Sequence, residues 1–361
     1  MAERVVVAMS GGVDSSVAAA LLVEEGWEVV GVGLRLADRP PAPEAESFHR
    51  GCCAPRDLAD ARAVAAKLGF PFYVMDVREV FRGAVIEGFA DAYLRGRTPN
   101  PCVDCNQVVK FRHLADKARA LGATRLATGH YARRVRTGDG TLTLARSADR
   151  AKDQTYFLFG LDQAQLGLAM FPLGGMDKAA TGEAARRLGL PNAEKPESQE
   201  ICFVPEGDYR AFLGRERPGW SRPGEIVDGE GNVLGAHAGV AGFTVGQRRG
   251  LGLAGGAPRY VVRLEAGSAT VVVGDREDLH RERFLVERVR WSLPIEEEGR
   301  RLLVQVRHRQ TPAPCLVRPL PGGMAGVEPG DPAALGAVAP GQAAVFYAGD
   351  LLHGGGWVGG D

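Results

Sequence analysis

The sequence has no long apolar run, no secretion signal and no net charge. Its 361 residues include 44 Lys+Arg and 44 Asp+Glu, which argues against a protein that coats nucleic acid, and no DNA partner is expected. No apolar run reaches the roughly 20 residues that cross a bilayer, so no membrane partner is expected either. We therefore predict a cytoplasmic protein whose 6 cysteines are reduced thiols available for chemistry, metal binding or packing.

The first half of the chain alternates strand and helix patterns. Alternation of this kind predicts an α/β fold built on a parallel sheet. The predicted strands are Arg4–Ala8, Glu28–Leu34, Phe70–Asp76 and Thr124–Thr128, and the predicted helices are Asp14–Glu25, Asp57–Leu68 and Val108–Leu121. Asp57 is expected to be the N-cap of its helix. The stretch 37–51 is rich in Pro, Ala and Glu and is predicted to be a surface loop.

The pattern changes near residue 205, where helical periodicity ends and Gly/Pro turns separate short alternating segments. Predicted strands there are Tyr260–Leu264, Thr270–Gly274, Leu302–Arg307 and Ala343–Tyr347. We expect three domains: a catalytic α/β domain over 1–204, a small β-rich central domain over 205–275 and a C-terminal β-barrel over 276–361.

The segment SGGVDSS at 10–16 lies between a predicted strand and a predicted helix. Two glycines allow a tight turn whose amides point into one concavity, and the serines add hydroxyl donors. The lysine of a Walker A loop is absent, and so is the G-x-G-x-x-G pattern. The segment resembles the loop of PP-loop ATP pyrophosphatases, which implies cleavage of ATP to AMP and pyrophosphate, with Asp14 helping to hold Mg²⁺.

Three cysteines are candidates for chemistry. Cys102 and Cys105 form a Cys-x-x-Cys pair in a proline-rich loop that opens a helix. By itself the pair is compatible with half a zinc site, a redox pair or cluster ligands, and no second pair follows. Cys202, between Ile201 and Phe203, reads by itself as a buried packing residue. Cys52 and Cys53 are predicted to be structural or to be loop thiols without an assigned role, and Cys315 is predicted to be a packing residue.

Seven motifs in order span nearly the whole chain, and together they are far more specific than any one of them. They resemble those of bacterial tRNA-specific 2-thiouridylases, which place sulfur on C2 of the wobble uridine in the tRNAs for lysine, glutamate and glutamine. The motifs are SGGVDSS at 10–16, GRTPNPCVDCN at 96–106, ATGHYAR at 127–133, KDQTYFL at 152–158, SQEICFV at 198–204, GFTVGQRRGLG at 242–252 and GQAAVFY at 341–347.

The resemblance implies a role for each matching residue. Cys105 matches the nucleophile of the family and Cys202 its persulfide-bearing cysteine. The ATP site would comprise Ala8, Met9, Ser10, Gly11, Gly12, Val13, Asp14, Ser15, Leu34 and Gly129. The tRNA contacts would be Asn100, Pro101, Cys102, His130, Lys152, Asp153, Gln154, Arg307, His308 and Gln342.

The implied reaction begins with adenylation of the uracil oxygen, because the C2 carbonyl is a poor electrophile. Sulfur then attacks C2, either from the Cys202 persulfide or as hydrosulfide released by Cys105, and AMP departs. The implied partners are the tRNA anticodon stem-loop and a persulfide-donating sulfur carrier or cysteine desulfurase. Many relatives have Asp where this chain has Cys102, so Cys102, Cys105 and Cys202 offer three thiolates for a [4Fe–4S] cluster, an alternative route.

Two other functions remain open from the sequence. A PP-loop synthetase that amidates a small molecule would use the same loop without needing Cys105 or Cys202. A non-catalytic RNA-binding protein would keep the loop as a relic. Tight ATP binding with tRNA-dependent release of pyrophosphate would exclude the non-catalytic RNA-binding protein. Loss of activity on replacement of either thiol would exclude the amidating synthetase.

Overall fold

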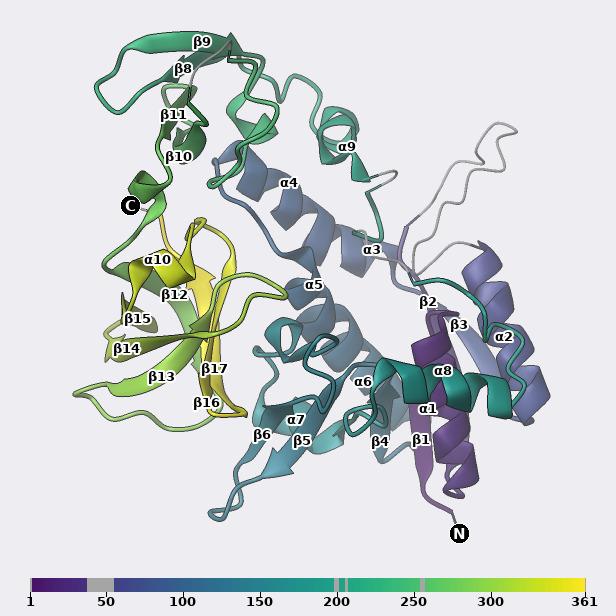
Figure 1. Ribbon diagram of the computed structural model, residues 1–361. Coiled ribbons are helices and arrows are strands. Elements are labelled where there is room, and N and C mark those ends of the chain that lie inside the picture. Colours follow the sequence, from purple (N-terminus) through teal and green to yellow (C-terminus); the bar gives the residue numbers. More distant parts are fainter. Residues whose placement is uncertain (1, 38–54, 198–200, 205–206, 254–256, 361) are drawn as a thin grey trace. The chain divides into compact units, whose positions relative to one another are not determined.

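The computed structural model describes residues 2–37, 55–197, 201–204, 207–253 and 257–360 (Figure 1). Its internal contacts divide the chain into two compact units. The first is Met1–Val85 with Cys102–Gly207, and the second is Ile86–Pro101 with Asp208–Asp361. Cys52, Cys53 and nearly all of the predicted surface loop lie outside the described residues, and the predicted three-domain division stays a prediction.

The first unit is built on a parallel five-stranded sheet in the order β3-β2-β1-β4-β7. Its strands are β1 (Arg4–Ala8), β2 (Glu28–Arg35), β3 (Phe72–Asp76), β4 (Arg125–Thr128) and β7 (Ala169–Met170). The accompanying helices include α1 (Val13–Glu24), α2 (Pro55–Leu68), α3 (Arg78–Phe81), α6 (Leu114–Ala120), α7 (Gln163–Leu168) and α8 (Lys178–Arg187). A hairpin of β5 (Ala132–Arg136) and β6 (Leu142–Arg146) follows β4.

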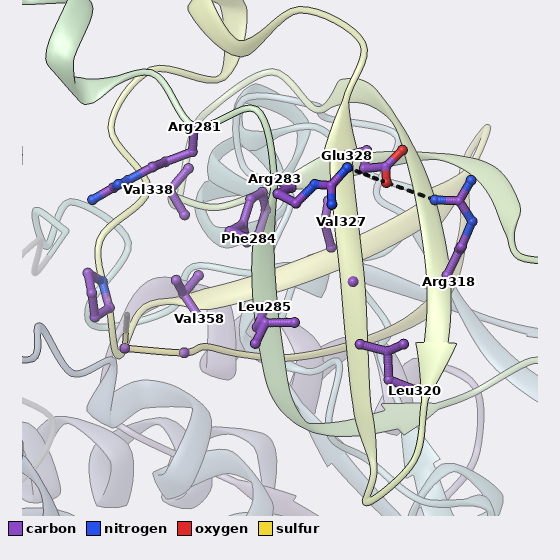
Figure 2. Close-up of a pocket in the computed structure, with 14 residues that line it drawn as sticks. Arg281, Arg283, Phe284, Leu285, Arg318, Leu320, Val327, Glu328, Val338 and Val358 are labelled. Atoms are coloured by element: carbon purple, nitrogen blue, oxygen red, sulfur yellow. Dashed lines mark hydrogen bonds and ion pairs between the residues drawn. The ribbon is translucent and has the colours of Figure 1, made fainter.

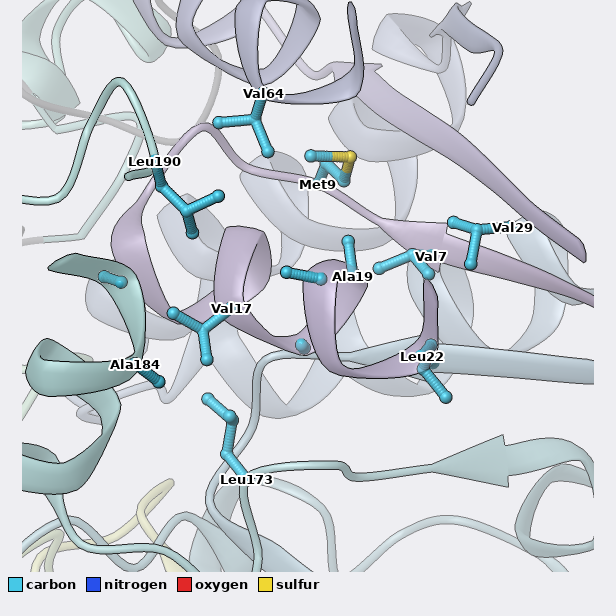
Figure 3. Close-up of a cluster of buried hydrophobic side chains, with 14 of the residues drawn as sticks. Val7, Met9, Val17, Ala19, Leu22, Val29, Val64, Leu173, Ala184 and Leu190 are labelled. Atoms are coloured by element: carbon cyan, nitrogen blue, oxygen red, sulfur yellow. The ribbon is translucent and has the colours of Figure 1, made fainter. Parts of the chain in front are cut away.

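The core of this unit packs around α1, which contacts both α2 and α8 (Figure 1). Small residues make this possible: Ala18 and Ala19 are fully buried, so neighbouring elements approach the helix closely. Figure 3 shows Val7 of β1, Val17 and Leu22 of α1 and Leu190 after α8 in one cluster. The two elements that flank the segment at 10–16 are therefore held rigidly on both sides.

The second unit contains a mixed sheet and a closed barrel. The sheet has the order β10-β11-β8-β9, with strands β8 (Gly224–Val227), β9 (Val233–His237), β10 (Tyr260–Glu265) and β11 (Thr270–Gly274). The barrel strands are β12 (Phe284–Trp291), β13 (Arg300–Gln305), β14 (Ala313–Leu320), β15 (Met324–Pro329), β16 (Ala343–Ala348) and β17 (Leu351–Val358). Pairing of β12 with both β15 and β17 closes the barrel, and the predicted fold class is confirmed.

Three local predictions were wrong. Helix α2 begins at Pro55, a favourable residue for a first turn, and Asp57 is a buried residue of the helix rather than its N-cap. The helix predicted over Val108–Leu121 begins earlier, as α5 (Pro101–Asp104), and continues as the π-helix η2 (Cys105–His113) and then as α6. Helical structure also recurs after residue 205, in α9 (Tyr209–Glu216), capped by the Asp208 carboxylate.

The second unit also contains two short helices, α4 (Glu87–Leu94) and α10 (Pro332–Leu335). In the part of the chain that the structure describes, every helix is too short or too polar to traverse a bilayer.

Candidate active site

The segment at 10–16 forms a tight loop between β1 and α1, closed by its own hydroxyl groups. The backbone N–H of Ser10 donates to Ser15 Oγ at 3.2 Å, and Ser15 Oγ donates to the Gly12 carbonyl at 3.1 Å. Gly11 has a φ of +75°, a conformation that favours glycine. The loop leads into the N-terminal end of α1, where backbone amides and the helix dipole favour an anion.

Gly129, just after β4, lies against this loop. A Cβ at this position would be 2.6 Å from the Ser15 nitrogen and 2.7 Å from the Asp14 carbonyl carbon. Only glycine therefore allows the end of β4 to approach the start of α1 so closely.

A cavity of about 210 Å³ lies beside the loop. Its lining combines apolar and polar side chains, a combination that suits a nucleotide with a base and phosphates. Its lining residues are Ala8, Met9, Ser10, Asp14, Ser15, Val32, Leu34, Leu36, Lys110, Thr128, Gly129, His130 and Gln154. Seven of the ten residues predicted for ATP are among them, and the other three, Gly11, Gly12 and Val13, belong to the loop backbone.

The Asp14 carboxylate is held by two neighbours. Its Oδ1 accepts from the Tyr131 hydroxyl at 3.0 Å and from Lys178 Nζ at 2.6 Å. Lys178 also pairs with Glu197 at 2.6 Å. Burial disfavours the ammonium form of Lys178, but its hydrogen bonds to Asp14 and Glu197 outweigh burial and raise its pKa. Burial is also the main cause of the raised pKa of Tyr131, so its hydroxyl stays a donor.

Mg²⁺ is usually held by one or two carboxylates together with substrate phosphates. Among the described residues no group of three His, Cys, Asp or Glu side chains could hold a metal ion. Asp14 thus offers one carboxylate beside the loop, which fits a magnesium ion that arrives with a nucleotide. The same finding means that Cys102, Cys105 and Cys202 do not form a three-thiol metal site here.

The segments that carry the two thiols predicted to react both contact α3. Cys105 is buried at the start of η2, and η2 packs against α3. Cys202 is half-buried, and the ring of its neighbour Phe203 contacts Phe81 of α3 edge-on, with centroids 5.6 Å apart. The structure therefore brings the surroundings of the two cysteines to one helix, and Cys202 is more exposed than a packing residue.

The π-helix η2 connects Cys105 to the cavity. In a π-helix each turn is wider, with hydrogen bonds between residues i and i+5, and such turns are frequent at functional sites. Lys110 stands five positions after Cys105 and lines the cavity beside the loop. Sequence reasoning missed Lys110, as well as Val32, Leu36 and Thr128, because their relation to the loop depends on strands and turns distant in sequence.

Two predicted tRNA residues line the same cavity. His130 Nδ1 lies 2.7 Å from Thr128 Oγ1, and its ring packs near Phe111 and Phe171. Burial, and then the nearby charge of Lys110, hold the pKa of His130 well below its usual value. Gln154 accepts from the Tyr131 amide at 2.9 Å. These contacts place a neutral imidazole and an amide group beside the loop.

The other predicted tRNA residues have varied surroundings. In the first unit, Asp153 is buried and accepts from Ser147 N and Thr155 Oγ1, while Lys152 pairs with Glu197. Cys102 is exposed. Asn100, Pro101, Arg307, His308 and Gln342 belong to the second unit.

A larger cavity, of about 420 Å³, lies on the barrel and is unrelated to the predicted site (Figure 2). Leu285 and Leu320 line it, and Arg283 and Arg318 share the Glu328 carboxylate at its edge. It contains no cysteine and none of the predicted catalytic, ATP or tRNA residues. The smaller cavity is therefore the candidate active site.

Comparison with known proteins covers the whole chain. A family model described as "tRNA methyl transferase HUP domain" matches residues 3–206. Models described as "tRNA methyl transferase PRC-barrel domain" and "Aminomethyltransferase beta-barrel domain" match 210–275 and 281–358. Among solved structures, a 4-thiouridine synthetase–RNA complex with bound ATP has 17% identity, covers 60% of this chain and 51% of that chain, and has a TM-score of 0.36, too low to bear on function.

Full-length relatives are more informative. A tRNA-specific 2-thiouridylase MnmA of Geobacter metallireducens is 52% identical over 358 residues, covering 99% of this chain and 96% of the relative. Its namesake from Paramagnetospirillum magneticum is 51% identical and covers 98% and 95%, respectively. The resemblance seen in the motifs is thereby confirmed. The chain belongs to the family of tRNA-specific 2-thiouridylases, enzymes that transfer sulfur to tRNA.

Proposed function

We propose that this enzyme replaces the C2 oxygen of the wobble uridine with sulfur in the tRNAs for lysine, glutamate and glutamine, using ATP. The observation that carries the proposal is the shared cavity. Residues of the loop at 10–16, Gly129, and Lys110 of η2, the helix that begins with Cys105, all line it. Loop and thiol-bearing helix are thus available to the same substrate. The sequence-predicted cytoplasmic location stays a prediction.

In the first step the uracil O2 attacks the α-phosphate of ATP and pyrophosphate leaves. The loop at 10–16 would hold the pyrophosphate through amides and serine hydroxyls, and Lys110 would lie near the developing negative charge. Asp14 would hold the Mg²⁺, which neutralises phosphate charge when bound. Leu34 and Met9, two of the apolar residues that line the cavity, would face the adenine.

In the second step the Cys105 thiolate attacks the inner sulfur of a Cys202 persulfide. A Cys105–Cys202 disulfide forms, hydrosulfide is released, and hydrosulfide displaces AMP from C2. Direct attack by the terminal persulfide sulfur, with Cys105 closing the disulfide afterwards, gives the same products. The persulfide comes from a sulfur carrier or cysteine desulfurase, and an external thiol reduces the disulfide. The packing of both cysteine segments on α3 supports this pairing.

The test uses the purified chain with ATP, Mg²⁺, an unmodified glutamate-tRNA transcript, a cysteine desulfurase with cysteine as the persulfide donor, and an external thiol as reductant. We expect 2-thiouridine in the digested tRNA, measured by mass spectrometry, and pyrophosphate release that depends on tRNA. A transcript with cytidine at the wobble position is the matched control. Pyrophosphate release that needs no tRNA, or a digest without thionucleoside, would refute the proposal.

The Cys102→Asp variant tests the cluster alternative. On the persulfide route, the variant keeps most of its thiolation activity, because Cys102 is exposed and supplies no transferred sulfur. Iron and acid-labile sulfide are measured in anaerobically prepared wild type and variant, since an aspartate is itself able to ligate iron. A stoichiometric cluster required for activity in the wild type would overturn the persulfide route.

A further inference from the structure

Two side chains from outside the loop bind its Gly11 carbonyl. Asn192 Nδ2 donates to this oxygen at 3.0 Å and Lys195 Nζ at 3.1 Å. The peptide group is planar and trans, so a carbonyl fixed on one side directs the N–H of the next residue to the opposite side. The two donors therefore set the direction of the Gly12 amide.

These donors are themselves fixed. Lys195 Nζ pairs with Asp57 Oδ1 and Asp60 Oδ2, each at 2.5 Å, and both carboxylates belong to α2. Burial opposes the charge of Lys195, but the hydrogen bonds to the two carboxylates raise its pKa overall. Asn192 is 6% exposed, and its amide nitrogen also donates to Ser16 Oγ at 3.0 Å. The contacts thus tie the loop to α2 and to the start of α1.

The loop also packs against α2 so closely that position 11 has no room for a side chain. A Cβ at Gly11 would be 1.9 Å from the Asp57 carbonyl oxygen, and the φ of +75° is strained for other residues. Asp57 therefore meets the loop twice, by its backbone at Gly11 and by its carboxylate through Lys195. The loop conformation is set from outside the loop.

We propose that Asn192 and Lys195 are positioning residues for the pyrophosphate of ATP. They act through the Gly11–Gly12 peptide, holding it so that the Gly12 amide presents its hydrogen to the phosphate side. Neither residue touches the substrate in this role. The inference rests on the proposed use of ATP, and it assigns a function to two residues of the segment that follows α8.

Asn192→Ala and Lys195→Met test this role by equilibrium binding of ATP and of inorganic pyrophosphate, and by the KM values for ATP and tRNA. Each variant loses one hydrogen bond to the Gly11 carbonyl, so we expect the affinities for ATP and for pyrophosphate both to fall about ten-fold. The KM for tRNA stays unchanged, and Lys195→Arg restores most of the ATP affinity. If the two residues were purely structural, the variants would have a lower melting temperature but would not lose ATP affinity selectively over tRNA affinity.

Arg187→Met is the matched control. Arg187 pairs with Glu24 at 2.9 Å, so its loss removes an ion pair between α8 and α1 that does not touch the loop. Unchanged ATP binding in Asn192→Ala and Lys195→Met, or an equal loss of tRNA and ATP affinity, would overturn the inference. Because ATP and pyrophosphate binding need no sulfur transfer, the readout is independent of whether wobble uridine is the substrate.

Discussion

Thiolation by Cys105→Ser and by Cys202→Ser is expected to fall by roughly a thousand-fold or more, while tRNA-dependent pyrophosphate release continues. Serine is nearly isosteric with cysteine, but its hydroxyl is neither a thiolate nucleophile nor a persulfide carrier. In the proposed mechanism, adenylation uses the loop and the cavity rather than the thiols. The two steps should therefore separate, with adenylated tRNA or its hydrolysis product accumulating.

The measurement follows 2-thiouridine and pyrophosphate in parallel over a single turnover. Cys315→Ala is the matched control, because Cys315 is buried in the barrel core and burial raises the pKa of its thiol to about 12. That variant should thiolate as the wild type does. Full thiolation by either serine variant would show that the thiols do not carry the sulfur, and would favour a thiol-independent PP-loop enzyme.

ATP affinity in Gly129→Ala is expected to fall roughly 10- to 100-fold, since overpacking costs about 1–3 kcal/mol. The added methyl would lie 2.6 Å from the Ser15 nitrogen, so either β4 or the start of α1 must move. Both line the cavity, and movement of either displaces the amides that face the phosphates. Isothermal titration with ATP and a melting curve measure the two consequences separately.

Gly138→Ala is the control for this substitution. Gly138 lies between β5 and β6, where a Cβ would meet nothing within 4 Å. This variant should bind ATP normally. If Gly129→Ala also binds ATP normally, the close approach of β4 to the loop is not needed for nucleotide binding.

The sequence predicts this fold well where local pattern and tertiary structure agree. β1 was predicted to the residue, and α1 and β2 to within one residue at either end. Short β-branched runs mark the strands, and a glycine after the helix marks its end, so the local pattern fixes these boundaries. The loop was recognised because strand, glycines and helix follow one another directly. The closed barrel followed from turn signals between short alternating segments.

The contacts that complete the site could not be predicted in this way. Lys195 and Asp57 are far apart in sequence and meet only because the segment after α8 returns to α2. Asp57 looked like a helix cap, since capping is the commonest use of such a residue near a helix start. The π-helix has no periodic signal of its own, so the sequence pattern did not place Lys110 beside the loop.

That wide helix also restricts how the chain can change length. Wild-type spacing places nine residues, Cys105–His113, in η2. An ordinary α-helix turns by about 100° per residue, so residues five positions apart differ by about 140° around its axis, whereas residues four apart lie on one face. The five-residue spacing from Cys105 to Lys110 is therefore matched to the wide winding of η2. A chain shorter by one residue here would keep their relation only by becoming α-helical.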